Sequence, residues 1–246
     1  MEKEIIAGRK PVLEGLEQHV SIDRIYIDKG VKGDYEKSIR QLCREREIPL
    51  KTVPKQFFRK YGRLNHQGIL ALKASTIYYK LDDLLPALNE REKPPLVLLL
   101  EGVTDVRNLG AIARSAEVFG VDILVVPMKN SAPVNVEAYK TSAGAIQFLP
   151  IAREKSITSA IKRLKEYGFI IYGTELHGEK SPAEIQGDDR IALVMGSEDK
   201  GLGSETLKLL DEKIRIPQVG KSDSLNVSVA CGICLYEILK ERKFEK

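Results

Sequence analysis

The sequence is poor in the residues that form disulfides and metal sites. It has three cysteines and three histidines in 246 residues. Three cysteines cannot build a disulfide framework, so we expect a reducing, cytoplasmic setting. The histidines are scattered, so neither a metal cluster nor a hydrolytic triad is expected. No apolar run approaches the ~20 residues of a membrane helix, and the first residues lack the apolar core of a secretory signal.

Familiar nucleotide-binding motifs are also missing. The glycines at 196, 201 and 203 do not have the G-x-G-x-x-G spacing of dinucleotide folds. Gly220-Lys221-Ser222 resembles the end of a phosphate-binding loop, but Arg215 stands where that loop needs its first glycine. Without a phosphate loop or a metal cluster, a small-nucleotide hydrolase is disfavoured.

Positive charge is concentrated in the first third of the chain. Residues 1–78 contain 16 Lys and Arg against 10 Asp and Glu, whereas the remaining residues contain 23 against 25. A basic segment 1–78 followed by a near-neutral remainder indicates that residues 1–78 bind a polyanion such as nucleic acid.

Residues 1–78 are predicted to form a small α/β domain. Apolar periodicity indicates helices over 12–18 and 35–47 and strands over 22–27, 48–53 and 69–73. Between the last two strands, cations alternate with aromatic residues: Lys51, Lys55, Arg59, Lys60 and Arg63 with Phe57, Phe58 and Tyr61. Two interpretations are open. RNA bases could stack on the rings while the cations hold phosphates, or the segment could be an amphipathic helix with buried rings and a solvated basic face.

A charged run with prolines predicts a linker over residues 79–93. From residue 94 to residue 246, strands and helices alternate. The predicted strands are 96–100, 123–126, a strand near Phe148, 169–172, 191–195 and 214–216, and the predicted helices are 109–119, 136–143, 157–167 and 204–210. This order predicts an α/β domain with a mostly parallel sheet covered on both faces.

The last helix is predicted to follow a Gly/Ser/Asp-rich loop whose Ser222, Asp223 and Ser224 could cap it. Helical spacing places Val227, Ala230, Cys231, Cys234, Leu235 and Ile238 on one apolar stripe. We therefore expect Cys231 and Cys234, the C-x-x-C pair, to pack in the core. Val229 and Ile233 lie off the stripe, so we expect a second surface to cover this helix.

Ligands of parallel sheets bind beyond the carboxyl ends of the strands. The loops after Leu100, Tyr172, Met195 and Ile216 are each glycine-bearing and rich in small polar residues. Taken singly, their polar residues have ordinary explanations: Asn108 could cap a helix, Arg114 could pair with Glu117, and Glu198 could bind loop amides. Four such loops at one sheet edge favour a binding site.

Three long segments, in fixed order, resemble the motifs of the SpoU (TrmH-type) RNA ribose 2′-O-methyltransferases of the SPOUT superfamily. They are VLLLEGVTDVRNLGAIARSAEVFGVD at 97–122, IALVMGSEDKGL at 191–202 and IRIPQVGKSDSLNVSVACGICLYE at 214–237. IAGRKPVLEGL at 6–16 and NHQGILAL at 65–72 are similar to the family's N-terminal substrate-binding domain. The two-domain form is most similar to members that modify a guanosine of large-subunit ribosomal RNA.

The resemblance implies a deep trefoil knot in the C-terminal domain and a homodimer packed partly through the last helix. S-adenosylmethionine would lie bent in the knot, gripped by backbone groups at Gly196, Ile216 and Leu225, with the Thr174 loop alongside. The family's catalytic set falls on Asn108, Arg114, Glu198, Ser224 and Asn226, all of which are present.

The expected reaction is transfer of a methyl group from a sulfonium to a ribose 2′-oxygen of RNA, namely 23S ribosomal RNA or a pre-ribosomal particle. The family proposal makes the arginine the base. Deprotonating a guanidinium is costly, so Arg114 could instead hold an RNA phosphate while Asn108, Ser224 and Asn226 orient the hydroxyl. The alternatives are methylation of transfer RNA and an RNA-binding protein without catalysis.

Overall fold

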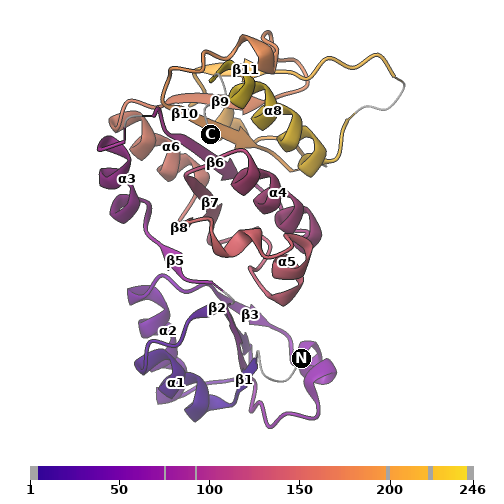
Figure 1. Cartoon of the computed structure of the whole chain (residues 1–246). Helices are drawn as coiled ribbons and strands as arrows, with labels where there is room; N and C mark the ends of the chain where they lie inside the picture. Colours follow the sequence, from indigo (N-terminus) through magenta and orange to yellow (C-terminus); the bar gives the residue numbers. More distant parts are fainter. Residues whose placement is uncertain (1–4, 75, 92, 198–199, 221–223, 243–246) are drawn as a thin grey trace. The chain divides into compact units, whose positions relative to one another are not determined.

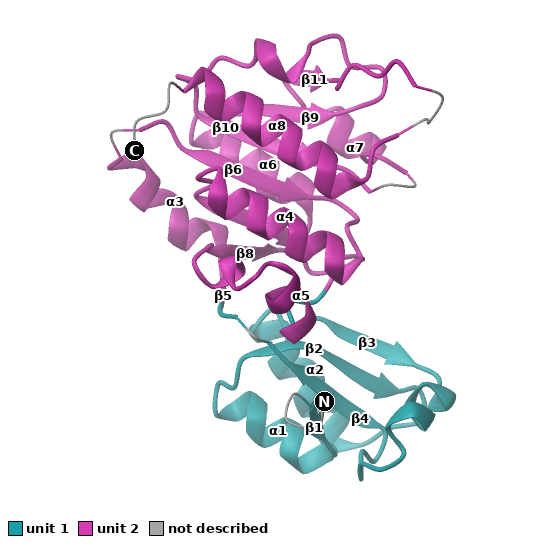
Figure 2. Cartoon of the chain, turned by 45° about the vertical axis from the view of Figure 1, so that its right-hand side comes forward, with its two compact units in different colours: residues 1–77, 133–135 teal, residues 78–132, 136–246 magenta. Residues whose placement is uncertain are grey.

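The computed structural model describes residues 5–74, 76–91, 93–197, 200–220 and 224–242. The chain divides into two compact units (Figure 2). Unit 1 contains residues 1–77 and 133–135, and unit 2 contains residues 78–132 and 136–246. None of the helices in the described ranges is both long enough and apolar enough to cross a bilayer.

Unit 1 is a four-stranded sheet with helices on one face and a short 3-10 helix on the other. Its elements are β1 (Ile5–Ala7), α1 (Arg9–Glu17), β2 (Ile22–Asp28), α2 (Asp34–Glu45), β3 (Leu50–Val53), η2 (Lys55–Tyr61) and β4 (Ile69–Lys73). The strand order is β1-β4-β2-β3. Only β2 and β3 pair in parallel, and the other two pairs are antiparallel.

Alternation along β2 and β4 creates two cores in unit 1. Ile25 and Ile27 face α1 and α2, and their neighbour Tyr26 faces η2. Phe58 is fully buried in this second core, stacked on His66, and Phe57 packs on Tyr26 at 4.5 Å between ring centroids. The segment is therefore a 3-10 helix with inward rings, and base stacking on Phe58 is excluded by its burial.

Unit 2 is built on a seven-stranded sheet in which every pair is parallel (Figure 1). The strand order is β11-β9-β10-β6-β7-β8-β5. The strands are β5 (Tyr78–Tyr79), β6 (Leu96–Leu100), β7 (Ile123–Pro127), β8 (Ile151–Glu154), β9 (Ile170–Thr174), β10 (Ile191–Met195) and β11 (Glu212–Ile214). The α/β architecture with a parallel sheet is confirmed, and the trefoil knot stays a prediction.

Helices cover both faces of this sheet. They are α3 (Leu81–Asn89), α4 (Val106–Val118), α5 (Val136–Thr141), η3 (Ala145–Gln147), α6 (Ile157–Glu166), η4 (Pro182–Glu184), α7 (Ser204–Leu207) and α8 (Val227–Glu241). One face packs on α3 and α6, and α4 and α8 lie side by side on the other (Figure 2). The central strands are buried throughout, as their continuous apolar sequences predict.

Three local expectations can be compared with the structure. The strand expected near Phe148 is present as β8, but it starts three residues later at Ile151: Phe148 is exposed after η3, and Pro150 cannot donate to a ladder. Segment 79–93, predicted as a linker, contains α3, whose Leu81, Leu85 and Leu88 are buried in the core of unit 2; the domain bounds stay a prediction. The last strand ends at Ile214 and does not reach Ile216.

Candidate functional site

A cavity of about 390 Å³ opens in unit 2 where β9, β10 and β11 end. Its walls come from residues 174–176 after β9, 195–197 and 200–202 after β10, 214–216 and 218 after β11, 207 of α7, and 224–225, 227 and 230 at the start of α8. These are the last three of the four loops singled out by the sequence. The loop after β6 does not line the cavity.

Gly196, Ile216 and Leu225, the three predicted cofactor-binding residues, all line this cavity. Gly196 is buried, and a Cβ built on it would lie 2.4 Å from the carbonyl carbon of Gly201. No side chain fits there, because the clash is with backbone. The wall at this point is therefore main chain, which suits recognition by backbone groups.

The wall at β10 is a tight reversal. The Ser197 and Gly201 backbones exchange hydrogen bonds of 3.2 and 2.9 Å, and the Lys200 N–H donates to Ser197 Oγ at 3.2 Å. Glu198, a predicted catalytic residue in this reversal, lies outside the described residues. Nothing in the described part therefore places its carboxylate.

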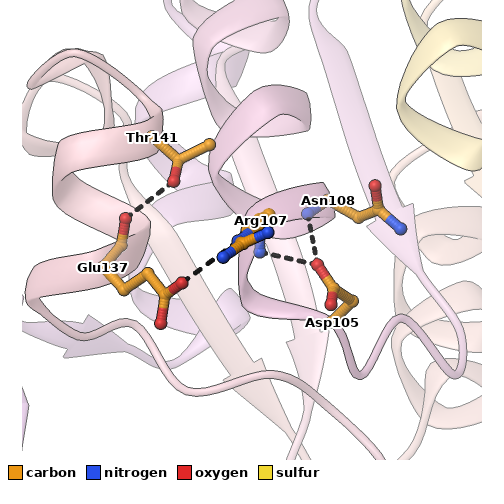
Figure 3. Close-up of polar contacts among 5 residues, drawn as sticks. All are labelled: Asp105, Arg107, Asn108, Glu137 and Thr141. Atoms are coloured by element: carbon orange, nitrogen blue, oxygen red, sulfur yellow. Dashed lines mark hydrogen bonds and ion pairs between the residues drawn. The ribbon is translucent and has the colours of Figure 1, made fainter.

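The first turn of α4 carries Asn108, but Asn108 is not its cap. Asp105 caps the helix, because its Oδ1 accepts from the backbone N–H groups of Arg107 at 2.8 Å and Asn108 at 2.9 Å. Figure 3 shows Arg107 directed at Glu137 of α5, at 3.3 Å, and the Asn108 side chain pointing away from that pair. Because Asp105 caps the helix, the side-chain amide of Asn108 is available for a tertiary contact.

Asn108 makes that contact with Asn226, 118 residues further along the chain. Asn226 Nδ2 donates to Asn108 Oδ1 at 3.1 Å. Asn226 also caps α8, since its Oδ1 accepts from the Ser228 N–H at 2.9 Å. The cap expected at residues 222–224 is wrong, and residues 222–223 lie outside the described ranges. Two predicted site residues are thus brought together, beside the Leu225 wall of the cavity.

The other two described site residues, Ser224 and Arg114, make no hydrogen bond with the Asn108–Asn226 pair. Ser224 lines the cavity. Arg114 is exposed on α4, and among the described residues it has neither a hydrogen-bond nor an ion-pair partner, so the expected pair with Glu117 is absent there. The structure does not bring Arg114 into contact with the two asparagines.

The two thiols of α8 are inert. Cys231 and Cys234 are fully buried, which confirms their predicted role in core packing. Burial raises the pKa of Cys234 to about 12, and the pKa of Cys231 is also raised. Neither thiol ionises near neutral pH, so neither is a nucleophile. Within the described residues, no group of three or more His, Cys, Asp or Glu side chains could hold a metal ion.

Comparison with known proteins shows the family to which the chain belongs. The model of the SpoU rRNA Methylase family matches residues 95–236, and the model for RNA 2′-O ribose methyltransferase substrate binding matches residues 5–77. A Staphylococcus aureus (strain MSSA476) protein assigned to the TrmH family of tRNA/rRNA methyltransferases is 34% identical over 98% of this chain and 98% of its own length. The chain belongs to the SpoU methyltransferase family.

Solved structures agree on the fold. The SpoU methyltransferase AviRb of Streptomyces viridochromogenes, in complex with AdoMet, aligns over 97% of this chain and 90% of its own, with a TM-score of 0.60 and 22% identity. The TrmH/SpoU tRNA modifying enzyme of A. aeolicus aligns over 66% of this chain and 82% of its own, with a TM-score of 0.56 and 31% identity.

Proposed function

We propose that the protein transfers a methyl group from S-adenosylmethionine to a ribose 2′-hydroxyl of RNA. The observation that carries this proposal is the cavity at the ends of β9, β10 and β11, with the Asn108–Asn226 pair beside its Leu225 wall. Membership of the SpoU family supports the reaction class.

The residues of the cavity fit the methyl donor. The volume of about 390 Å³ lies within the range of small-molecule sites. Gly196 gives the donor a side-chain-free wall, and Ile216 and Leu225 offer both apolar surface and backbone groups. When bound, the donor supplies an electrophilic methyl group on a sulfonium.

The residues of the chain act by aligning the ribose hydroxyl with the methyl donor. The hydrogen bond between the Asn226 and Asn108 side chains keeps both amides in place, and these amides orient the ribose hydroxyl. Ser224 lies in the adjoining wall of the cavity. Arg114 has no competing carboxylate among the described residues, so its guanidinium can hold an RNA phosphate. Glu198 is retained as a site residue in this proposal. Alignment of reacting groups lowers a barrier by about 7–11 kcal/mol.

Methyl transfer tests the proposal directly. Purified protein with tritiated S-adenosylmethionine and ribosomal RNA should yield labelled RNA, and nuclease digestion should place the label on a 2′-O-methyl nucleoside. Donor binding without any transfer to RNA would instead favour an RNA-binding protein without catalysis.

We propose a guanosine of large-subunit ribosomal RNA as the target, in the cytoplasm. The two-domain form resembles that of RlmB, which modifies a guanosine in the peptidyl-transferase region. Mapping of 2′-O-methyl sites in a strain that lacks the protein tests this choice. A missing methyl group in transfer RNA, with ribosomal RNA intact, would reassign the target.

We propose that the front domain, residues 1–78, binds the RNA and precedes a connecting segment 79–93 and the methyltransferase domain 94–246. Lys55, Arg59 and Arg63 are exposed in and after η2, and no described carboxylate pairs with them. Because Phe58 is buried and Phe57 and Tyr61 pack inward, contact through phosphates is favoured over base stacking.

We also propose that the protein is a homodimer with a knotted methyltransferase domain. On α8, Val229, Ile233 and Tyr236 are 51%, 36% and 47% exposed, and Val118 at the end of the adjacent α4 is 63% exposed. Such an apolar patch favours contact with a second copy. It is the over-wide face that the helix sequence predicted.

A further inference from the structure

Five residues of the cavity wall belong to one segment, the reversal between β10 and α7: Gly196, Ser197, Lys200, Gly201 and Leu202. This segment is held across its middle by the Ser197–Gly201 backbone pair. The Ser197–Gly201 pair joins the two arms of the segment to each other. The first arm continues β10, whose Met195 pairs with Leu100 of β6, and the second arm leads through Gly203 into α7. The residues that fix the ends therefore decide where the wall lies.

Glu101, the first residue after β6, holds both ends. Its backbone N–H donates to the carbonyl oxygen of Met195 at 2.9 Å, at the residue where the reversal begins. Its carboxylate accepts from the Gly203 N–H at 3.1 Å and from the Thr206 hydroxyl at 3.0 Å, where the reversal ends. Thr206 is fully buried.

The geometry at Gly203 shows how closely the carboxylate is seated. A Cβ on Gly203 would lie 3.2 Å from Glu101 Oε1, tighter than ordinary contact. Hydrogen bonds to an ionised acceptor are about twice as strong as neutral ones. The Glu101 side chain, directly after β6, thus ties the reversal after β10 to the neighbouring strand, although Glu101 itself does not line the cavity.

We propose that Glu101 is a positioning residue: it clamps the β10–α7 reversal so that Gly196 and Gly201 present their backbone to the methyl donor. The inference rests on the proposed function. It assigns no chemical step to Glu101, which acts only through the wall that it holds. Its removal should therefore weaken donor binding and leave RNA binding by the front domain unchanged.

The primary test is Glu101→Gln, measured by calorimetry with S-adenosylmethionine. The glutamine amide is neutral: its oxygen can still accept from the Gly203 N–H, and its NH₂ group can meet Thr206 only if that hydroxyl turns to accept. Both charge-assisted hydrogen bonds are therefore lost. We expect the dissociation constant to rise about 10-fold, and KM for the donor to rise with kcat at saturating donor retained. The affinity for an RNA fragment should not change.

A matched pair at Thr206 keeps the test decisive if Glu101→Gln folds poorly. Thr206→Val removes the hydroxyl that donates to Glu101, and Thr206→Ser keeps it. We expect weakened donor binding in the valine variant and wild-type binding in the serine variant, at a temperature where circular dichroism shows both folded. Equal donor affinity in the valine and serine variants overturns the positioning role. Absence of donor binding in the wild type would instead overturn the proposed function.

Discussion

The basic surface of unit 1 allows a quantitative prediction about RNA binding. Lys55, Arg59 and Arg63 are exposed, and replacing all three with glutamine should weaken RNA binding and flatten its salt dependence. Lys60 is left in place, because its Nζ lies 4.6 Å from the centroid of the Phe57 ring and 5.0 Å from that of Tyr61. Its loss would disturb the aromatic cluster as well as the charge.

The magnitude follows from counterion release. Each cation that neutralises a phosphate of a single strand adds about 0.7 to the slope of log affinity against log salt. Three cations give a slope difference of about 2, so the affinity lost between about 50 and about 200 mM salt should shrink by about 16-fold. The free energy of unfolding should change by no more than about 0.5 kcal/mol per exposed position.

Fluorescence anisotropy with a labelled ribosomal RNA fragment, titrated at several salt concentrations, measures this slope. The matched control replaces three exposed cations on the α2 side of the same unit, Lys32, Lys37 and Arg44, with glutamine. The control should keep the wild-type slope. An unchanged slope in the test variant, or the same flattening in the control, would refute the assignment of phosphate contacts to η2.

Four further predictions concern unit 2. Arg114→Ala should abolish methyl transfer while calorimetry shows nearly unchanged donor binding; lost donor binding would contradict its role. Gly196→Ala should weaken donor binding by about 5-fold or more, because overpacking against backbone costs about 1–3 kcal/mol, whereas Gly30→Ala in unit 1 should have no effect. Ile233→Asp should yield a monomer by light scattering, and a persistent dimer would argue against the α8 interface. Burial raises the pKa of the Cys234 thiol from 9.0 to about 12, so its contribution to stability should be full below pH ~9 and be lost by about 1.4 kcal/mol per pH unit towards pH ~12. The pKa values of Cys43 and Cys231 are raised as well and add their own losses, so Cys234→Ala should lose stability less steeply than the wild type; equal slopes would contradict the pKa shift.

The buried strands were predictable from the sequence because their apolar character is local and continuous. Leu96–Leu100 and Ile191–Met195 are apolar at every position, and both bounds match the structure. The apolar stripe of α8 was equally clear, since helical spacing alone separates Cys231 and Cys234 from the exposed Val229. The candidate loops followed from the rule that ligands bind at the carboxyl ends of parallel strands.

What the sequence could not supply was the choice among several equally suitable polar residues. Asp105, Asn108, Ser224 and Asn226 are all good helix caps by residue type. Asp105 and Asn226 cap α4 and α8, because the tertiary structure leaves Asn108 to bond with Asn226. Glu101 was missed for the same reason, although a carboxylate directly after a buried strand was a usable signal.

The cavity gathers its walls from residue 174 to residue 230, so its lining is incomplete until the start of α8 is in place. Unit 1 lies almost wholly within the first 77 residues. A chain synthesised from its N-terminus can therefore fold nearly all of unit 1 well before it has the cavity proposed for the methyl donor. If unit 1 binds RNA as proposed, a nascent or C-terminally truncated copy would occupy RNA without modifying it and would compete with the full-length protein.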